Sequence, residues 1–138
     1  MPRLLAPLLF GALVLGAVAA LLVTRELRSA EDAVSSVRIT HVLVPGPDGS
    51  GTAKIRFALA DPDRRADVLV IDPEERVVAT LASATELSAG RHKYRWDGRT
   101  DAGGRAPGGP YRVRIVLREQ TREVVPPGYI RVKPPDRA

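Results

Sequence analysis

Strong turn formers divide the chain from Val37 onward into short segments about ten residues apart. The separators are PGPDGSG at 45–51, DPDRR at 61–65, DPEER at 72–76 and DGRTDAGGRAPGGP at 97–110. The runs between them are rich in β-branched and aromatic residues, and the 12 Pro and 12 Gly of the chain interrupt any helical period. This spacing predicts an all-β fold for the region.

Seven strands are expected, and within them apolar residues alternate with charged ones. Ile55, Phe57 and Leu59, for example, share one face of their strand, and Lys54 and Arg56 share the other. One wet and one buried face per strand is the pattern of two antiparallel sheets packed face to face. We therefore expect a seven-stranded antiparallel β-sandwich of the immunoglobulin or fibronectin type III kind, with Trp96 and Tyr94 in its core. Its strands are Val37–Val44, Ala53–Leu59, Ala66–Ile71, Val77–Ala82, Arg91–Trp96, Tyr111–Arg118 and Tyr129–Lys133.

A hydrophobic segment precedes this region. From Leu4 to Val23 no residue is charged, and as a helix this run would span roughly 30 Å of hydrocarbon. Arg3 precedes the run and Arg25 and Arg28 follow it, so charge alone leaves the orientation open. The short N-terminal tail favours a cytoplasmic N-terminus. We predict a single-pass signal-anchor helix, with the following domain outside the cytoplasm.

A cleaved signal peptide is the alternative, because small residues at Ala17, Ala19 and Ala20 also follow the export pattern. Cleavage would give a secreted protein. The apolar run continues to Val23, past the most plausible cleavage point, and this length favours the anchor.

Ala12, Gly16 and Ala20 lie four residues apart, a stripe through which two such helices could approach closely. Small residues are common in an Ala-rich segment, so the stripe does not decide whether the chain is a homo-oligomer. The expected organisation has four parts: an anchor helix at 1–24, a charged juxtamembrane linker at 25–35, the sandwich at 36–133 and a tail at 134–138.

Composition limits the partners. Lys and Arg number 21 against 16 Asp and Glu, a net charge of +5 that suits anionic surfaces. The charge is spread along the chain and aromatic residues make up only 4%, whereas single-strand binders interleave basic residues with stacking rings. We expect no nucleic-acid partner. The absence of Cys excludes disulfides and thiolate zinc sites.

A basic strip is the best candidate for interaction. In the usual immunoglobulin strand order, Lys54 and Arg56 project from the same outer face as Lys93 and Arg95 of the neighbouring strand, and Arg38 joins them. Such a patch would suit anionic lipid headgroups, wall polymers or an acidic protein. The competing interpretation is that these cations only keep an exposed sheet face soluble.

A second strip, Arg112, Arg114 and Arg118, weakens the claim that the first is special.

Residues suited to catalysis or metal binding are sparse. The only histidines, His41 and His92, sit within predicted strands, where a half-exposed spacer role is usual. Asp97, Thr100 and Asp101 offer oxygen atoms at short spacing, but they do not match an EF-hand loop. We expect no catalytic residue, cofactor or metal site, and no enzymatic activity.

The segments ADVLVIDPEERVVATL and ELSAGRHKYRWDGRTDAGGRAPGGPYRVRI, between Ala66 and Ile115, resemble the Ig-like domain named after the bacterial flagellar hook-capping protein, the FlgD type. The matching residues are Asp72, Val77, Val78, Leu81, Gly90, Trp96, Asp97, Gly98, Pro107, Gly109 and Tyr111. The resemblance implies an Ig-like module of an exported bacterial protein.

The residues of this motif suit structural roles. Trp96 is expected to plug the space between the sheets, and Asp97 to accept hydrogen bonds from loop amides. Gly98 and Gly109 would allow positive φ angles in the long loop before Tyr111.

The chain departs from the family pattern in two places. Glu74, Glu75 and Arg76 stand where the family usually places a Gly, and Pro110 directly precedes Tyr111. Both departures bear on turn geometry more than on the fold.

The expected function is that of a membrane-tethered, extracytoplasmic, non-enzymatic module that binds a protein or a cell-envelope polymer in a structural or scaffolding role. The alternative is an accessory subunit that recruits or positions a cell-envelope enzyme or membrane complex. A fold alone does not choose between them.

Overall fold

The computed structural model describes residues 33–46 and 51–134. Within these ranges the chain forms nine β-strands: β1 (Val34–Ile39), β2 (Val42–Leu43), β3 (Ala53–Leu59), β4 (Asp63–Ile71), β5 (Val77–Leu87), β6 (Gly90–Trp96), β7 (Gly109–Leu117), β8 (Arg122–Val124) and β9 (Ile130–Val132). The expected anchor at 1–24, most of the linker and most of the tail lie outside the described residues. Within the described ranges, no helix has the length and apolar character needed to cross a bilayer.

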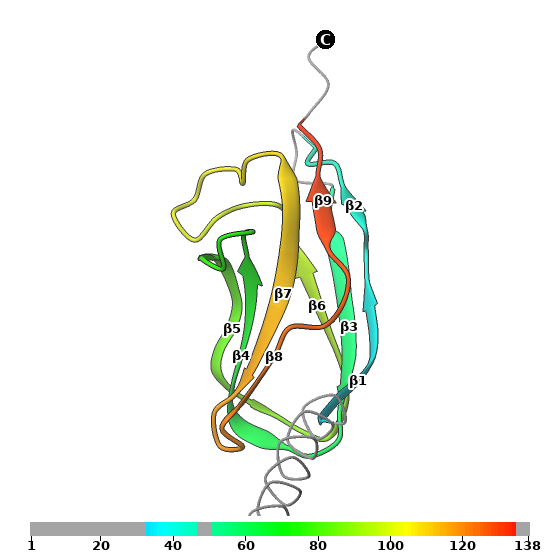
Figure 1. The fold of residues 1–138 in the computed structure, drawn as a ribbon, viewed down its shortest axis with the longest axis vertical. Helices are drawn as coiled ribbons and strands as arrows, with labels where there is room; N and C mark the ends of the chain where they lie inside the picture. Colours follow the sequence, from blue (N-terminus) through cyan, green and yellow to red (C-terminus); the bar gives the residue numbers. More distant parts are fainter. Residues whose placement is uncertain (1–32, 47–50, 135–138) are drawn as a thin grey trace, which may run out of the picture.

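The strands form two sheets. One has the order β1-β3-β6, and the other β2-β9-β7-β4-β5 with β8 paired to β7. Figure 1 shows β4, β5 and β7 on one side of the molecule and β1 and β3 on the other. The loop between β6 and β7 lies at the end near the C-terminus, opposite the end where β1 begins. The expected all-β sandwich is confirmed at this level, and the second and fifth predicted strands lie in one sheet together with the first part of the first predicted strand.

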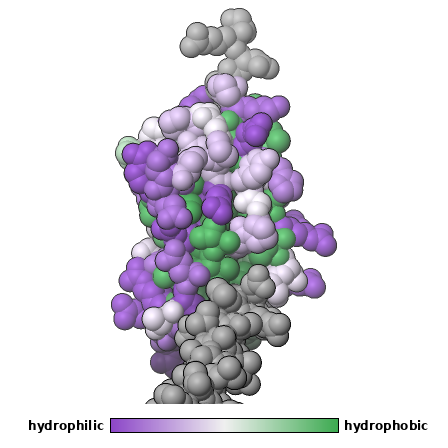
Figure 2. Space-filling view, in the orientation of Figure 1, coloured by the Kyte–Doolittle hydropathy of each residue, from purple (hydrophilic) through white to green (hydrophobic). Residues whose placement is uncertain are grey.

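The core lies between the two sheets, because alternate residues of each strand turn inward. Ile55 and Phe57 of β3 face Val113 and Ile115 of β7, and all four are at most 2% exposed. Trp96 is buried among them at the end of β6. In Figure 2 the flanks are mostly hydrophilic and hydrophobic residues gather between them, as this alternation requires.

The first predicted strand is wrong in one respect, since the structure divides it between the two sheets. At the end of β1, Thr40 exchanges two hydrogen bonds with Lys54: its N–H donates to the Lys54 carbonyl, and its Oγ1 accepts from the Lys54 N–H, both at 3.0 Å. The chain then crosses over, and β2 pairs in parallel with β9. The sandwich is therefore not entirely antiparallel.

The predicted count of seven strands is also wrong. Besides β2, the prediction lacks β8, whose three residues are too few to show alternation. β1 begins at Val34, before the expected start of the sandwich, and β4 and β5 extend to Asp63 and Leu87.

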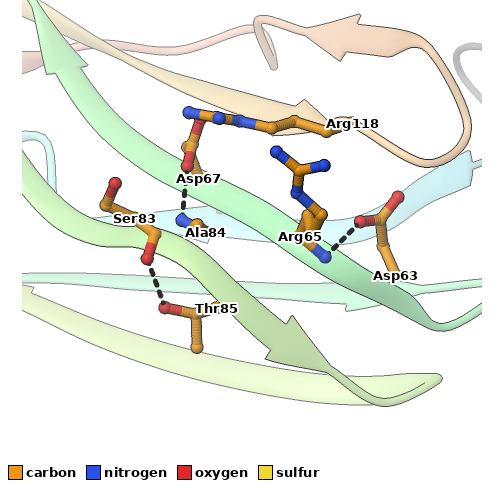
Figure 3. A network of polar contacts seen from close by, with 7 residues as sticks. All are labelled: Asp63, Arg65, Asp67, Ser83, Ala84, Thr85 and Arg118. Carbon is orange, nitrogen blue, oxygen red and sulfur yellow. Dashed lines mark hydrogen bonds and ion pairs between the residues drawn. The ribbon is translucent and has the colours of Figure 1, made fainter.

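The extension of β5 is irregular. Its pairing with β4 shifts register at several points, and Ala84 has a φ of 46°. A strand with register shifts and a residue of positive φ lacks the strict alternation of buried and exposed residues from which strands are predicted. Asp67 of β4, 5% exposed, contacts Ala84 of β5 and Arg118, which directly follows β7 (Figure 3).

Candidate functional site: the outer basic face

The cations predicted to share a face do so in the structure. β3 pairs with β6 so that Lys54 lies opposite Arg95 and Arg56 opposite Lys93. On the other side of β3, Arg56 also lies opposite Arg38 of β1. All five alternate with inward-facing residues and are exposed. Figure 2 shows hydrophilic side chains projecting from the flank on which β1 and β3 lie.

Arg91 is a sixth member that the prediction left out. It is the second residue of β6, lies opposite Ala58, is exposed, and points to the same side of the strand as Lys93 and Arg95. The alternation of β6 was sufficient to find it. We define the outer basic face as the following six residues: Arg38, Lys54, Arg56, Arg91, Lys93 and Arg95.

The charge of this face is not compensated by neighbouring residues. The sequences of β1, β3 and β6 contain no Asp or Glu. Among the residues that the structure describes, the ion pairs involve none of the six cations. The face therefore has its positive potential available to a ligand.

The face is hollowed in two places. One hollow, of about 510 Å³, is lined by Ser36, Arg38, Arg56, Phe57, Arg91, His92 and Lys93. A smaller one, of about 280 Å³, is lined by Arg38, Ile39, Thr40, Lys54 and Arg56. Arg38 and Arg56 belong to both, so the two hollows adjoin one another.

The second strip, on the other sheet, differs from this face. Arg118 is bonded to Asp67, and Arg114 lies 2.9 Å from Glu123 and 4.0 Å from Glu75. The Nε of Arg114 is buried, and its N–H does not point at the Glu123 oxygen, so this contact is an ion pair without a hydrogen bond. Two of the three cations of that strip are thus compensated locally.

The aromatic residues of the family motif meet in the core. Trp96 and Tyr111 pack edge to face with ring centroids 5.2 Å apart. The indole Nε1 donates to the Arg99 carbonyl at 2.8 Å, and the Tyr111 hydroxyl donates to the Pro107 carbonyl at 2.6 Å. Both rings therefore tie the β6–β7 loop to the sandwich.

The rest of the motif shapes the same loop. Asp97 Oδ1 accepts the Arg99 N–H at 3.0 Å, which is the expected turn role. Gly98 has a φ of 82°, and a Cβ there would lie 3.2 Å from Leu43 of β2. Gly109 opens β7 opposite Val132 with a φ of 146°.

The carboxylates of this loop accept hydrogen bonds from protein donors, and its Thr100 hydroxyl donates to a carbonyl of the same loop. Asp101 accepts the Thr80 N–H at 2.8 Å and the Thr80 hydroxyl at 2.7 Å, which pins the loop to β5. Thr100 Oγ1 lies 3.3 Å from the Gly104 carbonyl. Within the described ranges, no three His, Asp or Glu side chains gather as a metal site.

The histidines lie in separate places. His92 Nε2 is 2.7 Å from the Ser88 carbonyl, and its ring lies 5.7 Å from that of Phe57. His41 is exposed between β1 and β2, and its carbonyl accepts the Arg131 N–H at 2.7 Å. The structure does not bring the two together with a nucleophile.

Comparison with known proteins is consistent with this architecture. Residues 44–120 match the family model described as the FlgD Ig-like domain, which spans β3 to β7 and contains the motif from Ala66 to Ile115. No curated protein matches the chain. Among solved structures, the crystal structure of FlgD from P. aeruginosa is similar, with 22% identity and a TM-score of 0.49 over 67% of this chain and 71% of that one. Because the family model matches more than half of its residues, the chain belongs to the FlgD Ig-like domain family.

Proposed function

We propose that this protein is a non-enzymatic binding module of the bacterial cell envelope. Its N-terminal hydrophobic segment holds an Ig-like sandwich outside the cytoplasm, and the outer basic face binds an anionic protein or envelope polymer. The observation that supports this proposal is the gathering of six cations on three adjacent strands that contain no acidic residue.

This arrangement costs stability, which argues for a role beyond solubility. Lys54 and Arg95 lie directly opposite one another, as do Arg56 and Lys93, and like charges at such positions repel. A surface that only had to stay soluble would intersperse both signs of charge. An anionic ligand would relieve the repulsion, so the cost is recovered when the ligand binds.

The first test concerns the tether. The full chain is followed in the producing cells by fractionation, carbonate extraction, protease access from outside and sequencing of the mature N-terminus. We expect an intact, carbonate-resistant chain that only external protease cuts. A soluble chain whose mature N-terminus lies near Leu21 would mean that the hydrophobic segment is cleaved and that the protein is secreted, not tethered.

The second test concerns the face. Cross-linking in cells should capture a partner with the wild-type chain and lose it when Arg56, Lys93 and Arg95 are all changed to Glu. The matched control changes Arg64, Arg105 and Arg112 to Glu. These are exposed cations outside the three strands of the basic face, so the change in net charge is the same.

Equal capture by all three proteins would contradict the proposal, as would equal loss in both variants. The nature of the partner separates the two roles that the sequence leaves open. A captured envelope enzyme favours the accessory subunit, and a structural protein or polymer favours the scaffold.

A further inference from the structure

The two hollows of the outer basic face lie one after the other along the strands. The larger is lined near its end by Ser36 and Arg91, at the start of β1 and β6. The smaller includes Thr40, just past the end of β1, and Lys54, near the start of the antiparallel β3. Since both include Arg38 and Arg56, they form one groove that follows the strand direction.

Cations recur along the outer basic face, within and beside this groove, at a regular spacing. Outward residues of one strand are about 7 Å apart, and directly opposed residues of neighbouring strands are about 5 Å apart. Arg91, Lys93 and Arg95 form one such row, with Arg56 and Lys54 beside it. A single small anion would contact only part of this array.

The side-chain chemistry selects phosphate or carboxylate groups. Four of the six cations of the outer basic face are Arg, whose planar fork donates two parallel hydrogen bonds to either group. Ser36 lines the same groove, and a serine hydroxyl is a further hydrogen-bond donor for such groups.

We infer that the groove binds a linear anionic polymer with phosphate or carboxylate groups repeated along its length, which runs parallel to β1, β3 and β6 and is centred on Arg38 and Arg56. This inference rests on the proposed function and names its ligand class.

Two other anionic partners fit the face less well. Single-stranded nucleic acid needs exposed rings for base stacking, but Phe57 is only 2% exposed and Tyr94 turns toward the core. A bilayer surface is flat, and the exposed large hydrophobic residues of the described ranges lie outside β1, β3 and β6: Val42, Val44, Val77 and Tyr129.

The test uses the full chain in phosphatidylcholine nanodiscs, with linear polyphosphate and polygalacturonate as probes and neutral dextran as the blank. We expect at least one polyanion to bind and dextran not to bind. Raising NaCl from about 50 to about 300 mM should weaken the binding about tenfold or more, because the contacts are exposed charge pairs. Which polyanion binds distinguishes a phosphate polymer from a carboxylate one.

Variants locate the site. Changing Arg38 and Arg56 to Gln should weaken polymer binding about tenfold or more, because it removes the two cations that line both hollows. The control, Arg64→Gln with Arg112→Gln, has the same net charge and should stay within about twofold. Lys54→Gln with Arg95→Gln changes an opposed pair of the outer basic face, of which Lys54 lines the smaller hollow, and should also weaken polymer binding.

Four results would overturn the inference: no binding of either polyanion, equal loss in the control, inorganic phosphate that competes as well as polyphosphate per phosphate group, or displacement of the polymer by phosphatidylglycerol vesicles. Suppose that no polymer binds but capture of the cellular partner still requires Arg56, Lys93 and Arg95. The polymer inference then fails, and the proposed function holds with an anionic protein as the partner. If the polymer binds but cellular capture ignores these residues, the proposed function fails instead.

Discussion

Arg118 donates two hydrogen bonds to one carboxylate oxygen of Asp67, from Nε at 2.8 Å and from Nη2 at 2.7 Å. The other oxygen accepts the N–H of Ala84, at the irregular part of β5, at 2.7 Å. One buried side chain of β4 thus holds β5 on one side and the end of β7 on the other (Figure 3).

Asp67→Asn should lower the free energy of unfolding by about 1–3 kcal/mol, because it replaces charge-assisted hydrogen bonds at a buried position with weaker ones. Denaturant titration can follow this through Trp96, the one Trp of the chain and a buried residue. The control Asp61→Asn, at an exposed position, should change stability by less than about 0.5 kcal/mol. An equal effect of both substitutions would show that Asp67 does not hold the three strands together.

The contribution of Asp67 should disappear in acid. Burial raises its pKa, but the Ala84 N–H and the Arg118 guanidinium stabilise the carboxylate and outweigh burial, so the pKa lies below the ordinary 3.8. On acidification the unfolded chain binds the proton first, so the stabilisation is present above pH 3.8 and is lost as pH falls through the folded pKa. The difference in unfolding free energy between wild type and Asp67→Asn should therefore narrow from pH 7 to pH 3. Asp72, whose pKa is also lowered, is present in both proteins and cancels. A constant difference would contradict this prediction.

Gly98→Ala should cost about 1–3 kcal/mol of stability. The φ of 82° disfavours any residue with a Cβ, and the added atom would lie 3.2 Å from Leu43 Cδ2, where β2 crosses the loop. Gly104→Ala in the same loop is the matched control, since its φ is not positive and the nearest atom to the added Cβ, Thr100 Oγ1, is 4.0 Å away. Comparable melting temperatures for the two variants would show that β2 does not depend on this close approach.

Glu75→Gly should stabilise the protein by about 0.5–1 kcal/mol. Glu75 has a φ of 63° in the turn closed by Asp72, a conformation that glycine adopts without strain. Its ion pair with Arg114, at 4.0 Å, is too long and exposed to offset the gain. Glu74→Gly, at a residue without positive φ, should instead leave stability unchanged or lower it. A destabilised Glu75→Gly would mean that the exposed ion pair matters more than the backbone.

The turn at Glu75 also explains a departure seen in the sequence. The resemblance placed a Gly in this turn, and the structure keeps the left-handed conformation with Glu in its place. Asp72 makes this possible, because its carboxylate accepts the Arg76 N–H at 2.8 Å and bonds the Arg76 Nε at 2.9 Å. The turn therefore keeps its left-handed conformation at Glu75 although the Gly that the family usually has there is absent.

The sequence by itself determined the features that depend on short-range rules. Alternation within Ala53–Leu59 gave the bounds of β3 and the face on which Lys54 and Arg56 lie, because side chains on a strand alternate with a period of two. The motif from Trp96 to Tyr111 indicated the Ig-like domain. Glycines of this motif adopt the positive φ angles of the β6–β7 loop, and its two aromatic rings pack together in the core.

Tertiary structure alone decided what depends on pairs of residues far apart in the chain. The division of β1 from β2 accompanies hydrogen bonds to Lys54 and Arg131, and the irregular part of β5 is held by Asp67, which Arg118 binds on its other oxygen. The same holds for the two Arg strips, which look alike in the sequence. Only the fold brings Asp67 and Glu123 to Arg118 and Arg114 while leaving the outer basic face without an acidic neighbour on its strands, because ion pairing requires proximity in space and not in sequence.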